Sequence, residues 1–202
     1  MSALPDTLLI DPAGPRRRLL DALAEVVARK GYAETTIADI AAQARVSKRT
    51  FYEHFETKSD ALFALYQAAS AQAMQALMGA LDGRADWRGQ VEQAVHAYLS
   101  TLACNPPLLR TLFIEILHLG PEGLRVRREV NEQIANFIVR TVAGGAVPSP
   151  MLQTMAMAIV GGFNELILQA IERDEVARLA ELTPAASLLV RSVIDGCACT
   201  EA

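Results

Sequence analysis

Three helix-capping signals near the amino end constrain this chain more than any other feature. Thr36, Ser47 and Thr57 each precede helix-forming residues, and they lie eleven and ten residues apart. A threonine or serine at such a position accepts a hydrogen bond from a free backbone N–H of the first helical turn. Thr36 and Thr57 are each followed three residues later by an aspartate, which is the capping-box spacing. Only short helices with tight turns fit between the caps, and this arrangement predicts a helix-turn-helix.

The helix expected over residues 48–55 has two different faces. Phe51 and Phe55 lie one turn apart and, together with Val46, form a stripe that we expect to be buried. The other positions carry almost only hydrogen-bonding side chains. A helix that enters the major groove of DNA must bury one side and leave the other free, so this pattern favours DNA binding. The expected packing partners of the aromatic stripe are Leu23, Ile37 and Ile40.

The remaining sequence predicts long helices with short breaks. A first helix runs from Arg16 until Gly31, and no run of alternating β-branched residues competes with helix anywhere. We therefore expect an all-α chain of about nine helices. The later helices are expected over residues 58–79, 87–103, 107–119, 122–143, 151–173 and from 183 onward.

The longest apolar stretch, residues 151–171, has the length of a membrane span. It contains Gln153, Asn164, Glu165 and Gln169, and a glutamate in lipid costs about 2 to 3 kcal/mol or more. We therefore expect a packed protein helix and no membrane partner. With no charged-then-apolar leader and too few cysteines for a disulfide framework, the chain is expected in the cytoplasm.

The charge distribution favours a local rather than a global nucleic-acid surface. The net charge is −4, which excludes a cationic coat. Basic and acidic residues are balanced over residues 1–60, so the whole acidic excess lies in residues 61–202. A DNA contact is therefore expected only near the amino end.

Three runs of residues follow each other in the helix-turn-helix segment. They are Thr36-Ile37-Ala38-Asp39-Ile40-Ala41, Val46-Ser47-Lys48 and Thr50-Phe51-Tyr52-Glu53-His54-Phe55-Glu56-Thr57-Lys58. Together they closely resemble the DNA-binding domain of the tetracycline-repressor (TetR) family. The resemblance implies a DNA-binding domain over residues 16–62 and a ligand-binding and dimerisation domain over 63–202. Residues 1–15 contain three prolines and a glycine and show no periodicity, so they are expected to form a flexible arm. Beyond residue 62 the likeness is only one of helical pattern.

The resemblance also implies which residues meet DNA. Phosphate contacts are expected from Thr36, Tyr52, His54 and Lys58, and contacts to base edges and nearby phosphates from Lys48, Arg49, Thr50 and Glu53. Ser47 and Arg45 complete the expected set, with Arg16, Arg17 and Arg18 as a basic arm.

Two positions depart from the family pattern. Arg45 stands where members usually have glycine, and a left-handed conformation there costs about 1 kcal/mol that a phosphate contact offsets. Arg49 stands at a second common glycine position and fits guanine, while Glu53 fits cytosine, so a G/C-containing half-site is expected.

Two further sets follow from the helices of the larger domain. The resemblance implies that these helices surround an effector cavity, which their aromatic and methionine side chains would line, although plain core is the alternative for each of them. The expected ligand-binding residues are Met74, Met78, Trp87, Tyr98, Phe113, Leu117, His118, Phe137, Phe163 and Asn164, with Arg110 and Glu165 as other polar anchors. The last two helices are expected to form the dimer interface through Met155, Ile159, Gly162, Leu166, Leu189 and Val193.

These expectations combine into one functional hypothesis. The chain is interpreted as a ligand-responsive transcriptional regulator, a repressor, which binds a palindromic double-stranded DNA operator as a homodimer and is released by a small apolar or amphipathic effector. It is expected to need no cofactor and no metal and not to be an enzyme. The alternatives are an all-α enzyme, a metal-binding helical bundle based on the Glu115 and His118 spacing, or an interaction module without DNA binding.

Overall fold

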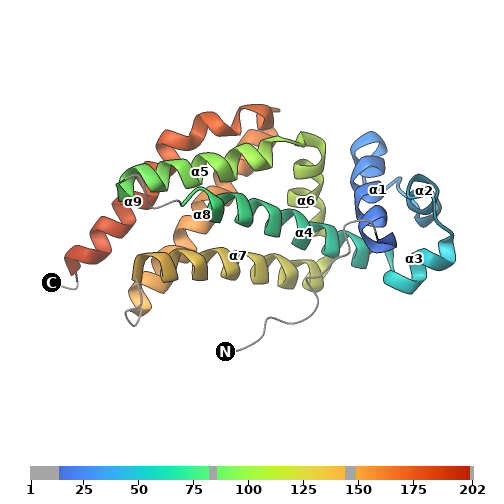
Figure 1. Cartoon of the computed structure of the whole chain (residues 1–202), viewed down its shortest axis with the longest axis horizontal. Helices are drawn as coiled ribbons and strands as arrows, with labels where there is room; N and C mark the ends of the chain where they lie inside the picture. Colours follow the sequence, from blue (N-terminus) through green and yellow to red (C-terminus); the bar gives the residue numbers. More distant parts are fainter. Residues whose placement is uncertain (1–13, 82–85, 144–148, 201–202) are drawn as a thin grey trace.

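The computed structural model describes residues 14–81, 86–143 and 149–200, so the expected arm over residues 1–15 lies almost entirely outside the described residues. Within these ranges the structure is helical with no strand, which confirms the all-α expectation (Figure 1). The elements are α1 (Pro15–Lys30), α2 (Ile37–Gln43), α3 (Lys48–His54), α4 (Lys58–Gly79), α5 (Trp87–Ala103), α6 (Pro106–His118), α7 (Gly120–Ala143), α8 (Pro150–Glu172), the 3-10 helix η2 (Val176–Leu182) and α9 (Thr183–Thr200).

All three predicted caps are present. The Thr36 hydroxyl accepts a hydrogen bond from the backbone N–H of Asp39, and the Thr57 hydroxyl accepts one from that of Asp60, each within a complete capping box. The Ser47 hydroxyl accepts one from the N–H of Thr50. α1 ends at Gly31, whose φ of 80° is a conformation that glycine adopts without steric cost. Local sequence therefore determines where these short helices begin.

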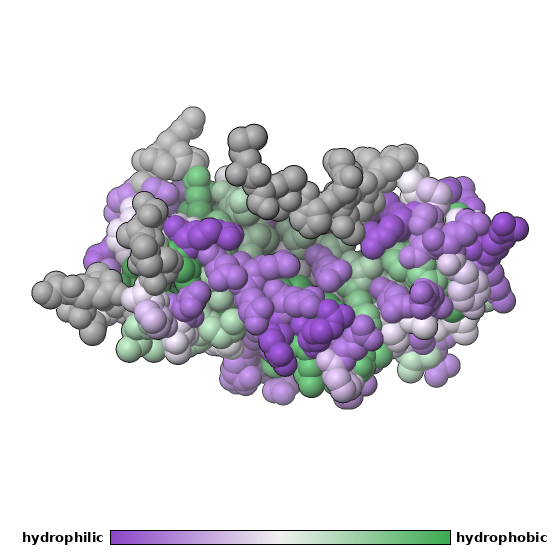
Figure 2. Space-filling model, turned by 90° about the horizontal axis from the view of Figure 1, so that it is seen from below, coloured by the Kyte–Doolittle hydropathy of each residue, from purple (hydrophilic) through white to green (hydrophobic). Residues whose placement is uncertain are grey.

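The helix-turn-helix lies at one end of an elongated molecule, and α4 runs from it along the larger helical part (Figure 1). α4 packs against α5 and α7, and α8 packs against α7 and α9. Seen from below, the central part of the molecule is covered mainly by hydrophilic residues (Figure 2). η2, which connects α8 to α9, was not expected from the sequence. It follows Asp174, which turns the chain after α8 with a positive φ of 58°.

The hydrophobic core does not divide at residue 62. One cluster joins buried residues of α1 to α3 with Leu62 and Tyr66 of α4, Ile116 of α6 and Val130 of α7. A second cluster fills the far part of the larger domain and includes Ala73 of α4. α4 thus belongs to both clusters, and it connects the helix-turn-helix rigidly to the larger domain.

α8 is the one helix in the described part of the chain that is long and apolar enough to cross a membrane. Its residues Ile159, Ile167 and Ile171 are buried within the second cluster, and Ala156 is buried in a third cluster with Val139 of α7. These contacts are those of a helix packed within a protein domain.

Candidate DNA-binding surface and ligand cavity

The inner face of α3 is closed as the sequence predicts. Phe51 is completely buried and Phe55 is nearly so, and their ring centroids lie 5.6 Å apart. Both belong to the cluster that holds Leu23 and Ile40, with Ile37 and Val46 packed against it. The aromatic stripe therefore attaches α3 to α1 and α2 and fixes which side of α3 faces outward.

The outer face of α3 carries the polar side chains expected to meet DNA. Tyr52 is 57% exposed. Arg49 donates from Nε to Oε1 of Glu53 at 3.2 Å, so each side chain orients the other. The Thr50 hydroxyl lies 3.0 Å from the Ser47 hydroxyl and is only half exposed. The exposed members of the set are Lys48, Arg49, Tyr52, Glu53 and His54.

The turn before α3 has the left-handed, strained conformation that the family resemblance implies. Arg45 has a φ of 54°, in the left-handed region that favours glycine. Its side chain is exposed, next to the N-terminus of α3. The chain therefore carries a guanidinium at a position where a glycine would relieve backbone strain.

Thr36 already has local partners in the capping box. Its hydroxyl donates to the carboxylate of Asp39, and this carboxylate also lies 2.6 Å from the ammonium of Lys30. Hydrogen bonds from Lys30 and Thr36 hold the pKa of Asp39 well below its usual value. An acidic group thus lies beside the expected phosphate contact.

Lys58 has a structural role that the sequence reading missed. Its Nζ donates to the backbone carbonyls of Tyr32 at 2.9 Å and Thr35 at 2.8 Å, with that of Ala33 at 3.4 Å, and it lies 4.2 Å from the centroid of the Tyr32 ring. An ammonium has three N–H donors, and these contacts occupy all of them. The geometry therefore gives no support to the expected phosphate contact. Lys58 instead attaches the start of α4 to the turn between α1 and α2.

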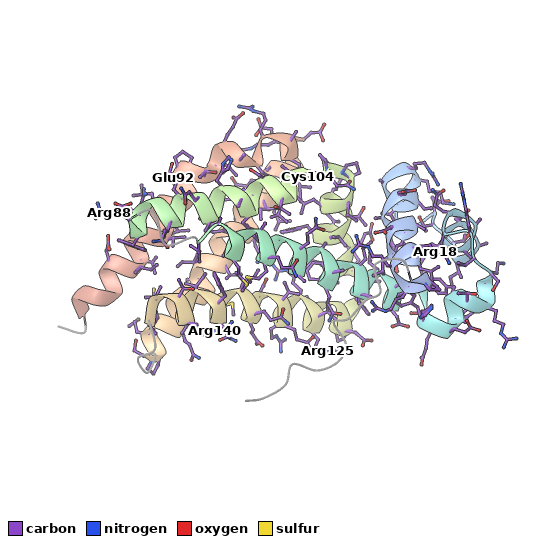
Figure 3. All side chains as sticks on the ribbon, in the orientation of Figure 1. Arg18, Arg88, Glu92, Cys104, Arg125 and Arg140 are labelled. Carbon is purple, nitrogen blue, oxygen red and sulfur yellow. The ribbon has the colours of Figure 1, made fainter. Side chains whose placement is uncertain are left out.

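The expected basic arm separates into three different environments. The Arg16 guanidinium lies 5.2 Å from the centroid of the Phe55 ring. Arg17 forms an ion pair with Asp21 at 2.9 Å. Arg18 is exposed on α1 (Figure 3).

A large apolar cavity lies in the far part of the larger domain. Its volume is about 430 Å³, within the range typical of small-molecule sites. Trp87, Tyr98, Phe137, Phe163 and Asn164, all expected to bind ligand, lie on its lining. The remaining lining residues are mostly aliphatic: Leu77, Leu81, Gln90, Val91, Ala94, Val95, Ile134, Ile138, Thr141, Val142, Ile159, Val160, Val190 and Ile194.

Several expected ligand residues lie elsewhere. Met78 and Leu117 are exposed large hydrophobic residues, and His118 is exposed at the end of α6. Met74 is also absent from the cavity linings, while Phe113 lines a second, adjacent cavity. Helical periodicity alone does not tell which stripe faces a cavity, and the aliphatic residues that line it look like ordinary core.

The structure does not support two polar sites considered in the sequence analysis: Arg110 as a ligand anchor, and Glu115 with His118 as a metal site. Arg110 donates from Nη2 to the backbone carbonyl of Ile171 at 2.8 Å, so it caps the C-terminus of α8 and is no ligand anchor. Glu115 and His118 belong to no metal-binding cluster, because the described residues bring no three His, Cys, Asp or Glu side chains together in such a group.

The expected dimer residues prove to be partly internal. Ile159 is buried and lines the large cavity, which contradicts its assignment to an interface. Gly162 faces Leu189 of the same subunit so closely that a Cβ there would lie 3.1 Å from Leu189 Cδ2. Met155, Leu166 and Val193 are half-buried. The sequence shows that α8 and α9 have more than one apolar stripe, but not which stripe faces the subunit's own core.

A two-faced α3 at one end of a helical bundle, with an apolar cavity at the other, defines a DNA-binding protein of the helix-turn-helix class. Residues 19–65 match the family described as bacterial regulatory proteins, tetR family. This part of the chain is therefore a DNA-binding domain of the kind found in TetR-family transcriptional regulators.

Individual relatives agree with this assignment. The chain is 26% identical over 121 residues to a fatty acid metabolism regulator protein of Bacillus subtilis, a match that spans 60% of this chain and 61% of that protein. It is 28% identical over 156 residues, 74% of this chain and 78% of the relative, to an HTH-type transcriptional repressor of Streptomyces coelicolor.

Solved structures share the fold. The regulator FadR from Bacillus subtilis in complex with stearoyl-CoA is 20% identical with a TM-score of 0.70, and the match covers 86% of this chain and 96% of that one. The fatty acid degradation regulator FadR from Bacillus halodurans is 18% identical with a TM-score of 0.69, covering 94% and 96%.

Proposed function

We propose that this protein is a ligand-responsive repressor whose effector occupies the 430 Å³ cavity and thereby weakens operator binding. The observation that carries the proposal is the course of α4. This helix begins where Lys58 is bonded to the helix-turn-helix, and its far end contributes Leu77 to the cavity lining, with Leu81 just beyond it. A change of cavity shape is therefore transmitted to α3 through one continuous, packed element.

The proposal includes a two-fold dimer on a palindromic operator. Two copies of α3 must lie about 34 to 36 Å apart to enter successive major grooves on one side of the duplex. An effector releases DNA only by binding more tightly to a conformation in which this separation is wrong. A coupling of about 1 to 3 kcal/mol weakens DNA binding roughly 5- to 150-fold.

The dimer surface is assigned to the outward stripe of α8 and α9. Met157 and Leu188 are large hydrophobic residues exposed there, and Ala158 is exposed beside Met157. Gly161, one turn further along α8, has no atom within 4 Å of a Cβ position, so its backbone is accessible to a close neighbour. This stripe replaces the internal positions Ile159 and Gly162 in the proposed interface.

The effector is assigned a hydrocarbon part. The lining of the large cavity is almost entirely aliphatic and aromatic, and such a surface selects apolar ligands. The Bacillus subtilis relative is named for fatty acid metabolism, and the FadR structure from the same organism holds stearoyl-CoA. We place the protein in the bacterial cytoplasm, acting by binding rather than by catalysis and without a cofactor.

The first test is selection of bound duplexes from a random pool, followed by titration of the selected operator at several salt concentrations. Lys48→Ala and Tyr52→Ala should weaken binding, and each lost phosphate contact should reduce the salt slope by about 0.9. Arg140→Ala is the matched control, because this exposed cation of α7 lies far from α3 (Figure 3). An absence of any selected duplex, or slopes identical in all four proteins, would contradict DNA binding through α3.

A further inference from the structure

A second cavity adjoins the first. Its volume is about 270 Å³, and it is lined from α4, α5, α6, α7 and α8. Tyr98, Ile134 and Asn164 line both cavities, so these side chains form a common wall. The second cavity is the more polar of the two in composition, with Ser70, Gln72, Thr101, Asn105 and Asn131 also on its lining.

Two tyrosines contribute hydroxyl groups to the second cavity, and one of them, Tyr98, also belongs to the common wall. Tyr66 is 7% exposed and Tyr98 is 9% exposed, and both line the second cavity. The structure shows no hydrogen bond from either hydroxyl to a described residue, and neither oxygen is fully enclosed: Ser187 Oγ is the one fully buried side-chain atom of the described residues that lacks a partner. Burial raises the pKa of both tyrosines, and the proximity of Tyr66 raises that of Tyr98 further, so both remain protonated donors. Both hydroxyls are therefore accessible from the cavity and can donate a hydrogen bond to a ligand there.

An amide pair extends the polar wall. Asn164 donates from Nδ2 to Oδ1 of Asn131 at 3.3 Å, which joins α8 to α7 across the cavity. This bond leaves the Asn131 amide N–H groups and the Asn164 carbonyl oxygen without partners among the described residues. Around Tyr98, the ring of Phe163 lies with its centroid 6.3 Å away and holds the phenol in place.

The wall contains hydrogen-bonding groups but no charge. Neither cavity is lined by an Asp, Glu, Lys, Arg or His side chain of the described residues. Arg127 of α7 lies near enough to influence the pKa of Tyr66, but it is not on either lining. The other arginines labelled on α7, Arg125 and Arg140, extend from its exposed side (Figure 3). A carboxylate or phosphate in these cavities would therefore meet no charged side chain on the lining, which is unfavourable.

We propose that the effector spans the two cavities, with a hydrocarbon chain in the larger one and an uncharged carbonyl group in the second one, beside the common wall, where Tyr66 and Tyr98 donate to its oxygen. A carbonyl oxygen has two lone pairs and accepts both bonds. The hydrocarbon part fills the 430 Å³ with about a dozen heavy atoms, since each takes up roughly the 30 Å³ of a water molecule. This inference rests on the proposed effector cavity, and it names the class of ligand: a neutral ester, thioester, amide or ketone with an apolar chain.

The chain contains its own reporter for the test. Trp87 is the only tryptophan in the sequence, and it lines the larger cavity, so its fluorescence reports occupancy. Three probes with the same number of carbons are titrated into the full chain: nonane, methyl heptyl ketone and nonanoate. The ketone should bind most tightly, because only it combines an apolar chain with a neutral acceptor. Tighter binding of nonanoate, or equal binding of nonane and the ketone, would overturn the inference.

Shape-conserving variants then assign the effect to the two hydroxyls. Tyr66→Phe and Tyr98→Phe should each weaken ketone binding about three- to tenfold, while nonane binding stays the same or improves. Tyr32→Phe is the matched control, because this buried tyrosine lies outside both cavities and should change neither affinity. Ketone affinity that is unchanged in both cavity variants would overturn the inference. Operator binding is measured separately without probe, so a failure of DNA binding is distinguished from a failure of this ligand assignment.

Discussion

The two ends of this molecule treat their polar groups in opposite ways. In the helix-turn-helix, Thr36, Ser47, Thr57 and Lys58 are engaged with nearby backbone groups, and the aromatic core of α3 is closed. At the second cavity, the side chains of Tyr66 and Tyr98 are buried, and their hydroxyls make no hydrogen bond to a described residue. The first pattern fixes the geometry of a surface before its partner arrives, whereas the second leaves hydrogen-bonding capacity for a ligand.

The largest difference between the two ends should appear when one phenylalanine is truncated in each. Phe51→Ala should lower the free energy of unfolding by about 3 to 5 kcal/mol, because Phe51 is surrounded on all sides in the closed core. Phe163→Ala should cost clearly less, because one side of Phe163 already faces a cavity and has fewer contacts to lose. Urea denaturation followed by circular dichroism measures both. Equal losses would contradict the distinction between a closed and an open core.

The two lysines at the DNA-proximal end, Lys48 and Lys58, should have different roles, one in DNA binding and one in stability. Lys58→Met should lower the free energy of unfolding by about 2 to 3 kcal/mol, since it removes charge-assisted bonds to the carbonyls of Tyr32 and Thr35. Lys48→Met, at an exposed position of α3, should leave stability nearly unchanged but weaken operator binding.

Thermal unfolding measures the stability of the two lysine variants, and a mobility-shift titration measures their affinity for the operator. If Lys48→Met proved the more destabilising, or Lys58→Met lost DNA affinity at full stability, the assigned roles would be reversed.

Sequence alone sufficed where the determining interactions are local. The caps at Thr36, Ser47 and Thr57 act over three residues, and the stripe of Phe51 and Phe55 acts over one turn, so both could be predicted. The left-handed conformation of Arg45 was expected from the family resemblance, because family members usually have glycine at this position.

Long-range contacts could not be predicted in this way. The resemblance implies a phosphate contact for Lys58, but its hydrogen-bond partners lie 23 to 26 residues earlier in the same chain. Ile159 was assigned to an interface, yet it faces a cavity bounded by five helices. The hydrophobic period of α8 is the same whether a stripe faces the core, a cavity or a partner, so periodicity does not distinguish them.

Arg45 offers a smaller test, in which stability and function should change in opposite directions. Arg45→Gly should raise the free energy of unfolding by about 1 kcal/mol or less, because glycine adopts the φ of 54° without steric strain. The same change should weaken operator binding and reduce its salt slope, since it removes an exposed guanidinium beside α3. Arg45→Ala is the control, which removes the charge but keeps the strain. A glycine variant with undiminished DNA affinity would leave the arginine without the function that explains its strained position.

The smallest expected effect concerns the capping box of α2 and its dependence on pH. Hydrogen bonds from Lys30 and Thr36 lower the pKa of Asp39 below its usual 3.8, so the ionised carboxylate stabilises the folded state at neutral pH. This contribution is complete above the pKa of the unfolded chain and is lost as the pH falls below about 4 toward the lower folded pKa. A double-mutant cycle of Lys30→Met and Asp39→Asn should therefore give a coupling that is present at neutral pH and shrinks in acid. A coupling that persists unchanged in acid would show that the ionised carboxylate of Asp39 is not its source.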